Sequence, residues 1–380
     1  MDQEKEVETI EPVEKPVRVM RKSGIDLLRI FAILLIVFSH ANQTMRGIVV
    51  FPNYSPLNFV SLGLTQFGNI GNILFVICSS YFLVDKTRTR TEKAINILID
   101  SALISVGILV GFLIAQQPLS KETIVWQILP DIFKMNWFVP CYVVFYLLSP
   151  IVVMGLRQLS KKAHFILSIV LMVVYGILSM LTLHPVGSML FQFFYLLTLV
   201  AFIKWHIPSI YKYKKINLLI FGVGIIISFA GFFGFQMLYW HNPNWLNPNI
   251  AIIDFNSAYA PILVIALLCL FNVFAEMKFE NGFISYLSSC SLFVYVIHEN
   301  YLLRSYTRVE YYKFMVSHYG GDNLMMVWMV ICALFMFVVG FILAVGYKES
   351  IHRLTGKLSS WLNNLLLKLF DSVYKKLFKE

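Results

Sequence analysis

Apolar segments, most of them close to twenty residues long, recur along almost the whole chain with short polar connections between them. A helix of about twenty residues crosses the hydrocarbon core of a bilayer, which is about 30 Å thick. Only 14% of the residues are charged, below the roughly 25% that is typical of soluble domains. We therefore expect an all-α integral membrane protein, a bundle of about ten transmembrane helices. The expected spans are residues 25–44, 67–84, 95–115, 137–155, 164–183, 188–204, 217–238, 256–275, 286–303 and 325–346.

Lysine and arginine in the connections predict how this bundle is oriented. With a cytoplasmic amino terminus, the inner connections hold nineteen of these residues and the outer connections hold six. Positive charge is enriched in cytoplasmic loops, so we expect a multi-pass protein of the cell membrane with both termini in the cytoplasm. The net charge of +10 is spread over these loops and forms no folded basic module. We therefore expect no nucleic-acid partner.

Two polar tails flank the predicted transmembrane domain, residues 25–346. Residues 1–24 form a polar cytoplasmic tail, which is acidic first and basic later. Residues 347–380 repeat leucine at helical spacing with lysines between. This pattern predicts a basic amphipathic helix on the anionic inner leaflet, and membrane lipids as partners. A helix that binds another protein is the weaker alternative.

The first apolar segment carries two polar side chains, Arg29 and His40, eleven residues apart. Eleven residues make about three helical turns, so both side chains share one face, about 16 Å apart. Such groups inside a membrane usually face a cavity or a partner. A guanidinium binds phosphate or carboxylate, and an imidazole can take a proton from an alcohol, so the pair predicts a catalytic site. The alternatives are an ion pair of Arg29 with Asp26 and a structural hydrogen bond of His40 between helices.

The ninth apolar segment holds a second group of polar side chains. Ser291, Tyr295 and His298 fall on one helical face, and Glu299 follows directly. A membrane histidine with tyrosine and glutamate beside it predicts a proton relay or a substrate cradle. The alternative is that Glu299 only marks the outer end of the helix.

Two connections carry weaker signals. Residues 85–93 include Arg88 and Arg90, whose ordinary role is to set topology; the alternative is contact with the phosphates of a cytoplasmic donor. Residues 239–255 combine aromatic residues with Asn and Asp, which suits sugar rings. The sequence has no P-loop, GxGxxG, HExxH or GxSxG motif, and its cysteines lack zinc-site spacing. We expect no metal and no tightly bound cofactor.

The first segment resembles the opening signature of the acyltransferase-3 family, integral-membrane enzymes that acylate extracytoplasmic glycans. The family pattern has an Asp, an Arg three residues later and a His eleven beyond that Arg, which Asp26, Arg29 and His40 match. Ser80 stands where the family usually has Gly. The resemblance covers about residues 24–346. Further similar segments are Leu74–Leu83, Arg88 with Arg90, Asn136-Trp137-Phe138, Tyr146–Pro150 and Ser291–His298.

The resemblance implies transfer of an acyl group, most often acetyl, to a hydroxyl of a cell-surface glycan or its lipid-linked precursor. The implied donor is an acyl-CoA, acetyl-CoA in particular, supplied from the cytoplasm. Arg29, with Arg88 and Arg90, would bind its phosphates, and Asp26 would orient Arg29. His40 would be the general base or a transient acyl carrier. The residues expected on the acceptor side are Tyr295, His298, Glu299 and Trp137.

Two other classes of protein fit part of the sequence. Ten spans with central polar groups are also typical of an exporter or flippase for a polysaccharide or lipid-linked sugar. The spacing of Arg29 and His40 favours the enzyme, as does the absence of a matched pair of Gly/Pro-interrupted segments. An assembly partner with degenerate chemistry is the third interpretation.

Overall fold

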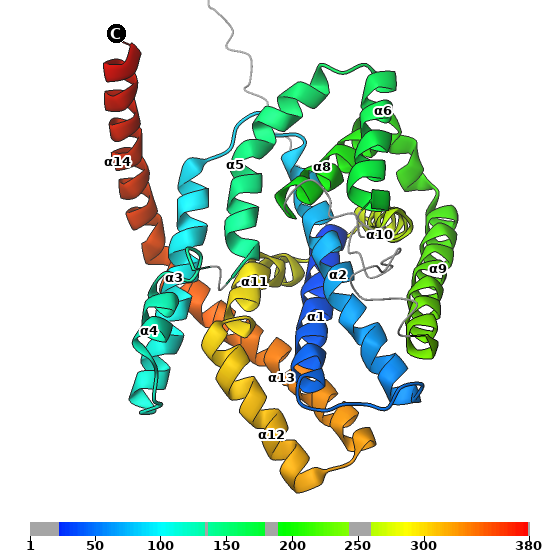
Figure 1. The fold of residues 1–380 in the computed structure, drawn as a ribbon. Helices are drawn as coiled ribbons and strands as arrows, with labels where there is room; N and C mark the ends of the chain where they lie inside the picture. Colours follow the sequence, from blue (N-terminus) through cyan, green and yellow to red (C-terminus); the bar gives the residue numbers. More distant parts are fainter. Residues whose placement is uncertain (1–22, 134–135, 179–188, 243–259, 379–380) are drawn as a thin grey trace, which may run out of the picture.

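The computed structural model of this protein describes residues 23–133, 136–178, 189–242 and 260–378, and within these ranges it is helical without strands. Seven helices are long and apolar enough to cross a membrane (Figure 1). They confirm the all-α membrane architecture, whereas the total of about ten spans stays a prediction. The seven are α1 (Ser23–Arg46), α2 (Pro56–Leu83), α3 (Thr91–Ile114), α5 (Phe138–Arg157), α8 (Met189–His206), α9 (Lys214–His241) and α13 (Asp322–Glu349).

Three shorter elements lie where the remaining spans are predicted. The first is α6 (Lys161–Leu171), which continues into the π-helical η1 (Met172–Ile177). The other two are α10 (Pro261–Ala275) and α11 (Gly282–His298). Almost all of the amino-terminal tail, the turn at His184-Pro185 and most of the outer connection 239–255 lie outside the described residues.

Three connections that we expected to be loops contain helical residues instead. α2 begins at Pro56, where the Ser55 side chain accepts a hydrogen bond from the backbone of Asn58. Hydropathy did not predict the first turns of α2 because polar side chains there are buried in hydrogen bonds. Ser61, for example, donates to Asn42 at 2.9 Å. The other two connections contain α4 (Lys121–Ile128) and the pair η3 (Leu303–Thr307) and α12 (Arg308–Tyr319). A short 3-10 helix, η2 (Pro208–Lys212), lies between α8 and α9, and the long helix α14 (His352–Phe378) follows α13.

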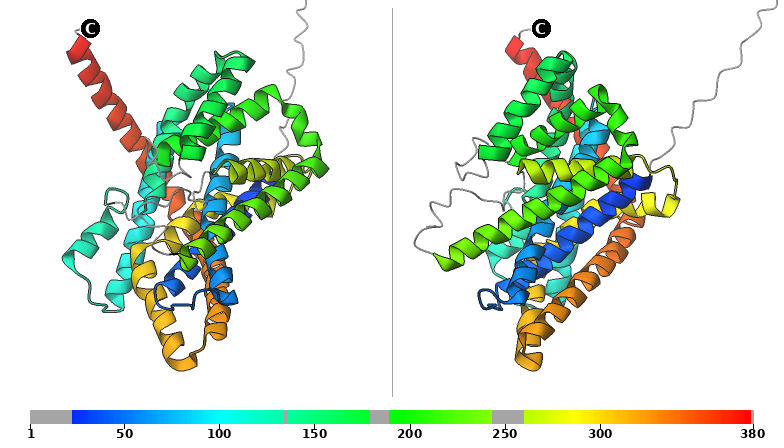
Figure 2. Two further views of the ribbon diagram at one scale, coloured as in Figure 1. Left: turned by 45° about the vertical axis from the view of Figure 1, so that its right-hand side comes forward. Right: turned by 90° about the vertical axis from the view of Figure 1, so that its right-hand side faces the viewer.

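α1 lies at the centre of the bundle and packs against α2, α10, α11, α12 and α13. Its approach to α2 is close because Gly71 has no side chain: a Cβ there would lie 2.5 Å from the carbonyl oxygen of Ala32. In the apolar window of α1, 61% of the residues are buried, against 11% in α9, which lies at the edge of the bundle (Figure 2). Polar groups on α1 are therefore enclosed by protein on most sides.

The carboxy-terminal helix α14 runs antiparallel to α3 along its first half (Figure 1). Thr355 donates to Asp100, Ser360 to Glu92, and Thr91 to Asn363. The polar side of this half therefore faces α3, while large apolar side chains point outward; Leu354 is 68% exposed and Trp361 is 60% exposed. The structure thus places the first half against the bundle, and contact of the outward side with the inner leaflet stays a prediction.

Candidate active site

Two cavities lie along the face of α1 that carries Arg29 and His40. Arg29, near the start of α1, lines a cavity of about 590 Å³, and His40 lines one of about 120 Å³. We name them the inner pocket and the outer pocket after the predicted orientation. Phe75 of α2 lines both cavities and therefore lies at the boundary between them. The shared face predicted from the sequence thus leads from one pocket to the other.

In the inner pocket, Arg29 pairs with Asp26, as the sequence alternative anticipated. Its Nη1 lies 3.9 Å from Asp26 Oδ1 and donates to Ser288 Oγ at 3.4 Å. Asp26 also accepts a hydrogen bond from Ser285 at 2.7 Å. The guanidinium carbon lies 5.9 Å from the centre of the Phe75 ring. The ion pair therefore holds Arg29 in the pocket wall next to the boundary residue.

The basic connection reaches the inner pocket through lysines. Lys86 and Lys93 line the pocket, whereas Arg88 and Arg90 are absent from its lining. Arg90 instead donates its backbone N–H to the Tyr146 hydroxyl at 3.3 Å. Burial, together with the nearby charges of Lys93 and Arg90, lowers the pKa of Lys86. Crowded cations of this kind favour the binding of an anion.

The outer pocket brings three of the predicted residues together. His40, Trp137 and Tyr295 all line it, and the amide side chains of Asn69 and Asn72 add polar groups to its wall. His298 and Glu299 do not line it, since they contact His40 from behind. The amides and aromatic rings can hydrogen-bond and stack on a hydroxylated ligand.

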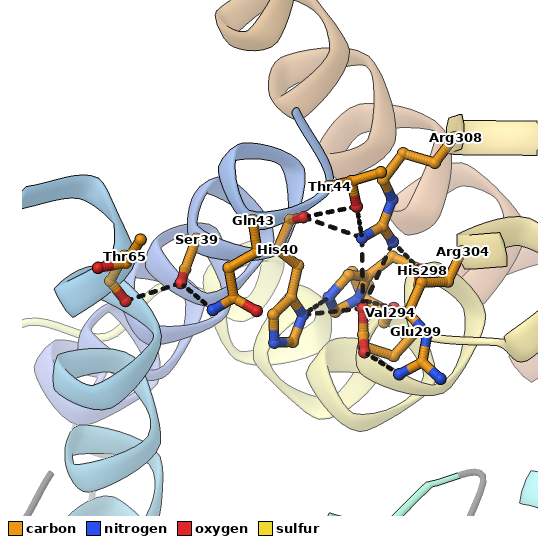
Figure 3. A network of polar contacts seen from close by, with 10 residues as sticks. All are labelled: Ser39, His40, Gln43, Thr44, Thr65, Val294, His298, Glu299, Arg304 and Arg308. Atoms are coloured by element: carbon orange, nitrogen blue, oxygen red, sulfur yellow. Dashed lines mark hydrogen bonds and ion pairs between the residues drawn. The ribbon is translucent and has the colours of Figure 1, made fainter. Parts of the chain in front are cut away.

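The ring of His40 is fixed by two neighbours from the end of α11 (Figure 3). His40 Nδ1 lies 3.0 Å from Glu299 Oε1 and 3.0 Å from His298 Nε2. His298 Nδ1 donates to the Val294 carbonyl at 2.8 Å, so Nε2 of neutral His298 can only accept. The network therefore assigns the His40 proton to Nδ1 and leaves Nε2, on the far edge of the ring, as the free basic nitrogen.

Two arginines that we had not assigned to the site hold Glu299. Arg308 donates to Glu299 Oε1 at 3.4 Å and Arg304 donates to Oε2 at 3.3 Å. Arg308 is buried, and its guanidinium also donates to the backbone carbonyls of His40 and His298. Glu299 is thus a buried carboxylate held by cations rather than a simple marker of the helix end. Two arginines four residues apart, closely following an acidic residue, were the available sequence signal.

These arginines come from an irregular helical turn. Arg304 lies in η3, and Arg308 is the first residue of α12. Single π turns often occur at functional sites. Arg308 also donates to Thr44 Oγ1 at 3.3 Å, so one side chain links α1, the end of α11 and α12. This contact fixes His40 and Glu299 relative to each other.

The ligand atoms of His40, His298 and Glu299 lie within 4.8 Å of one another, close enough to hold a metal ion. A metal ion there would share the Glu299 carboxylate with two guanidinium groups, and the like charges would repel. The hydrogen bonds and ion pairs among these residues already balance the charge of Glu299 without a metal ion. The arrangement supplies an oriented imidazole with a carboxylate behind it, which can act as a general base.

The acyltransferase-3 family model, described as an acyltransferase domain, matches residues 22–346. The chain belongs to the acyltransferase-3 family. It is therefore a membrane acyltransferase. The matched residues include the whole lining of both pockets except Lys348 and His352. No curated protein and no solved structure matches the chain.

Proposed function

We propose that this acyltransferase moves an acetyl group from acetyl-CoA, bound in the inner pocket, to a hydroxyl of an extracytoplasmic glycan or lipid-linked glycan precursor in the outer pocket. The proposal includes about ten spans in the cell membrane with both termini in the cytoplasm. The excess of Lys and Arg in the inner connections supports this orientation. Donor and acceptor would then reach the enzyme from opposite sides.

The observation that carries the proposal is the pair of pockets that meet at Phe75. One is rich in cations and the other contains an oriented imidazole. Arg29 and His40 are eleven residues apart on α1, about 16 Å along the helix axis. A donor whose phosphates lie among the lysines can extend its flexible thioester arm past Arg29 towards His40. An exporter has no need for two different pockets joined at one aromatic side chain.

The donor side is supported by charge. The inner pocket is lined by four cations, Arg29, Lys86, Lys93 and Lys348, and by two carboxylates. Among the described residues, no carboxylate forms an ion pair with Lys86 or Lys93. Lysines that lack a counter-ion suit the phosphates of a CoA donor. Lys86 and Lys93 therefore join Arg29 as the proposed main donor contacts, and Arg88 and Arg90, which do not line the pocket, are proposed as weaker ones.

The acceptor side is supported by the tautomer of His40. Its Nε2 takes the proton of the acceptor hydroxyl as the oxygen attacks the thioester carbonyl. The C–O ester bond forms, the C–S bond breaks, and the proton passes to the departing thiolate. Glu299 stabilises the imidazolium, while Arg304 and Arg308 keep Glu299 ionised and in place. Tyr295 and Trp137 position the acceptor.

A two-step path, in which His40 carries the acetyl group for a time, uses the same atoms. Acetyl would pass from sulfur to His40 Nε2 and from there to the acceptor oxygen. Rapid denaturation at neutral pH, after brief exposure to radiolabelled acetyl-CoA, separates the paths, because only the second leaves label on a histidine and acid then removes that label.

Acetyl-CoA turnover by the purified full-length protein in liposomes tests the function itself. Release of free thiol, with the acetyl group passing to water because no glycan acceptor is present, would be compared in wild type, His40→Ala and His318→Ala, an exposed histidine of α12. We expect turnover in wild type and His318→Ala and at least a hundredfold loss in His40→Ala. No turnover and no acetyl-CoA binding by folded wild type would overturn the proposal and favour the exporter.

A further inference from the structure

Asp100 of α3 is a buried carboxylate, 2% exposed, away from His40 and Glu299. Among the residues that the structure describes, its hydrogen-bond partners come from the end of α13 and the start of α14. The Tyr347 hydroxyl donates to it at 2.7 Å, and Thr355 Oγ1 at 3.3 Å. His352 Nδ1 lies 3.0 and 2.9 Å from its two oxygens. We call these four residues the Asp100 cluster.

The Asp100 cluster joins a segment beyond the family match to the family domain. The match ends at residue 346, whereas Tyr347, His352 and Thr355 follow it. Two further contacts between α3 and α14, Ser360 to Glu92 and Thr91 to Asn363, continue the line of polar contacts. The segment is therefore attached to α3 by specific polar bonds, and its start has a defined position.

That position is the wall of the inner pocket. Asp100, Lys348 and His352 all line this cavity together with Lys86 and Lys93. The His352 ring packs edge-on against Phe293, 5.1 Å between centres, which limits its rotation. With Nδ1–H donated to Asp100, Nε2 lies on the opposite edge of the ring. Within the described ranges, this nitrogen makes no hydrogen bond.

We propose that His352 contacts an anionic group of the donor through Nε2, with Asp100 as its positioning residue, so that the start of the carboxy-terminal segment forms part of the donor site. This inference rests on the proposed function, because it requires the donor in the inner pocket. Asp100 fixes the ring, and Nε2 of protonated His352 can donate to a phosphate oxygen. The cluster acts on donor binding and leaves the chemistry at His40 unchanged.

Two donors that differ in their phosphates test the contact. Acetyl-CoA carries the phosphates, whereas acetyl-pantetheine has the same thioester arm without them. KM and kcat for thiol release would be measured for both, with full-length wild type, His352→Ala, His352→Gln and Asp100→Asn in liposomes. The matched control is Arg353→Gln, which removes an exposed cation one residue away that does not line the pocket.

We expect His352→Ala and His352→Gln to raise KM for acetyl-CoA about tenfold, the effect of losing one charge-assisted hydrogen bond. Their kcat should stay within about twofold of wild type. KM for acetyl-pantetheine should not change. Asp100→Asn should show the same selective effect at smaller size, and Arg353→Gln should match wild type with both donors.

Other outcomes overturn the inference. An unchanged KM for acetyl-CoA in folded His352→Ala would remove the contact. An equal loss with both donors, or a loss confined to kcat, would mean that His352 only supports the structure. Wild type that turns over neither donor would overturn the proposed function as well, whereas active wild type with unaffected His352 variants overturns only this inference.

Discussion

The described part of the chain contains two histidine–carboxylate pairs, one beside each pocket, and their surroundings differ. His40 Nδ1 lies 3.0 Å from Glu299, and His352 Nδ1 lies 2.9 Å from Asp100. Two guanidinium groups hold Glu299, whereas two hydroxyls, from Tyr347 and Thr355, hold Asp100. A histidine paired with a carboxylate thus occurs twice, in two different electrostatic environments.

The difference indicates two roles. The guanidinium groups beside Glu299 keep this carboxylate ionised, and they also repel a protonated His40 that pairs with the same carboxylate. Proton transfer at His40 therefore depends on the balance between this attraction and this repulsion. Hydroxyls beside Asp100 mainly orient the carboxylate. The first setting suits a base that gains and loses a proton in each cycle, and the second suits a fixed contact for a charged ligand.

The largest predicted difference between the pairs is in kcat. Glu299→Gln keeps an oxygen that can accept from His40 but leaves Arg304 and Arg308 beside the imidazolium without a counter-charge. We expect kcat for acetyl transfer to fall about 10²–10³-fold, whereas Asp100→Asn should leave kcat nearly unchanged. Steady-state kinetics of the purified variants measure both values.

Glu310→Gln is the control for Glu299→Gln, since Glu310 is an exposed residue of α12 paired with Lys313. Equal effects on kcat of Glu299→Gln and Asp100→Asn, in folded protein, would contradict the division of roles.

Phe75 tests whether the two pockets are separate compartments. Phe75→Ala enlarges the passage and admits water to the thioester, so we expect transfer to fall about tenfold while acetyl-CoA hydrolysis rises. The ratio of acetylated product to free thiol measures this uncoupling. Phe82→Ala is the matched control, because Phe82 also contacts Arg29, at 5.9 Å, but lines only the inner pocket. A ratio that is unchanged in Phe75→Ala would argue against a boundary at this residue.

The lysines of the inner pocket should affect donor affinity more than the neighbouring arginines. We expect Lys86→Gln and Lys93→Gln each to raise KM for acetyl-CoA about three- to tenfold, with weaker dependence on salt than wild type. Arg88→Gln and Arg90→Gln should change it less than twofold. Titrations with acetyl-CoA at two salt concentrations measure this order, and the reverse order would make Arg88 and Arg90 the main donor contacts of this connection.

Asp131, a half-buried carboxyl outside the two histidine–carboxylate pairs, gives the smallest predicted effect. It accepts a hydrogen bond from Ser101 at 3.0 Å, and burial raises its pKa to about 6. A raised carboxyl pKa favours folding while the group is protonated, so its contribution is lost as pH rises from about 4 to about 6. We expect Asp131→Asn to melt a few degrees higher than wild type at pH 7.5 but not at pH 4.5. Equal melting differences at both values would contradict this.

Helical spacing was enough to predict which side chains share a face. Asp26, Arg29 and His40 lie along the pockets, and Tyr295 reaches the outer pocket, because each set occupies one helix. The sequence could not predict that His40 meets Glu299, 259 residues later, or that Asp100 meets His352, because such pairs depend on how distant helices pack.

Charged residues were the hardest to place from sequence. Arg304 and Arg308 lie between the predicted spans 286–303 and 325–346, where the sequence predicts an outer loop, because low hydropathy does not distinguish a loop from a polar helix over a buried site. Lys86 and Lys93, rather than Arg88 and Arg90, line the inner pocket, because the local backbone decides which side chains point inward. Spacing within a connection gives no information on that direction.

Acetylation of the surface glycan, measured by NMR of polysaccharide extracted from cells, tests the central claim most directly. Cells with wild-type protein, His40→Ala or no protein would be compared, after confirming that the variant is inserted at wild-type level. The account predicts that acetyl signals disappear in the mutant and the deletion while the glycan itself is still exported. A glycan that is lost in the deletion and restored unchanged by His40→Ala would contradict it.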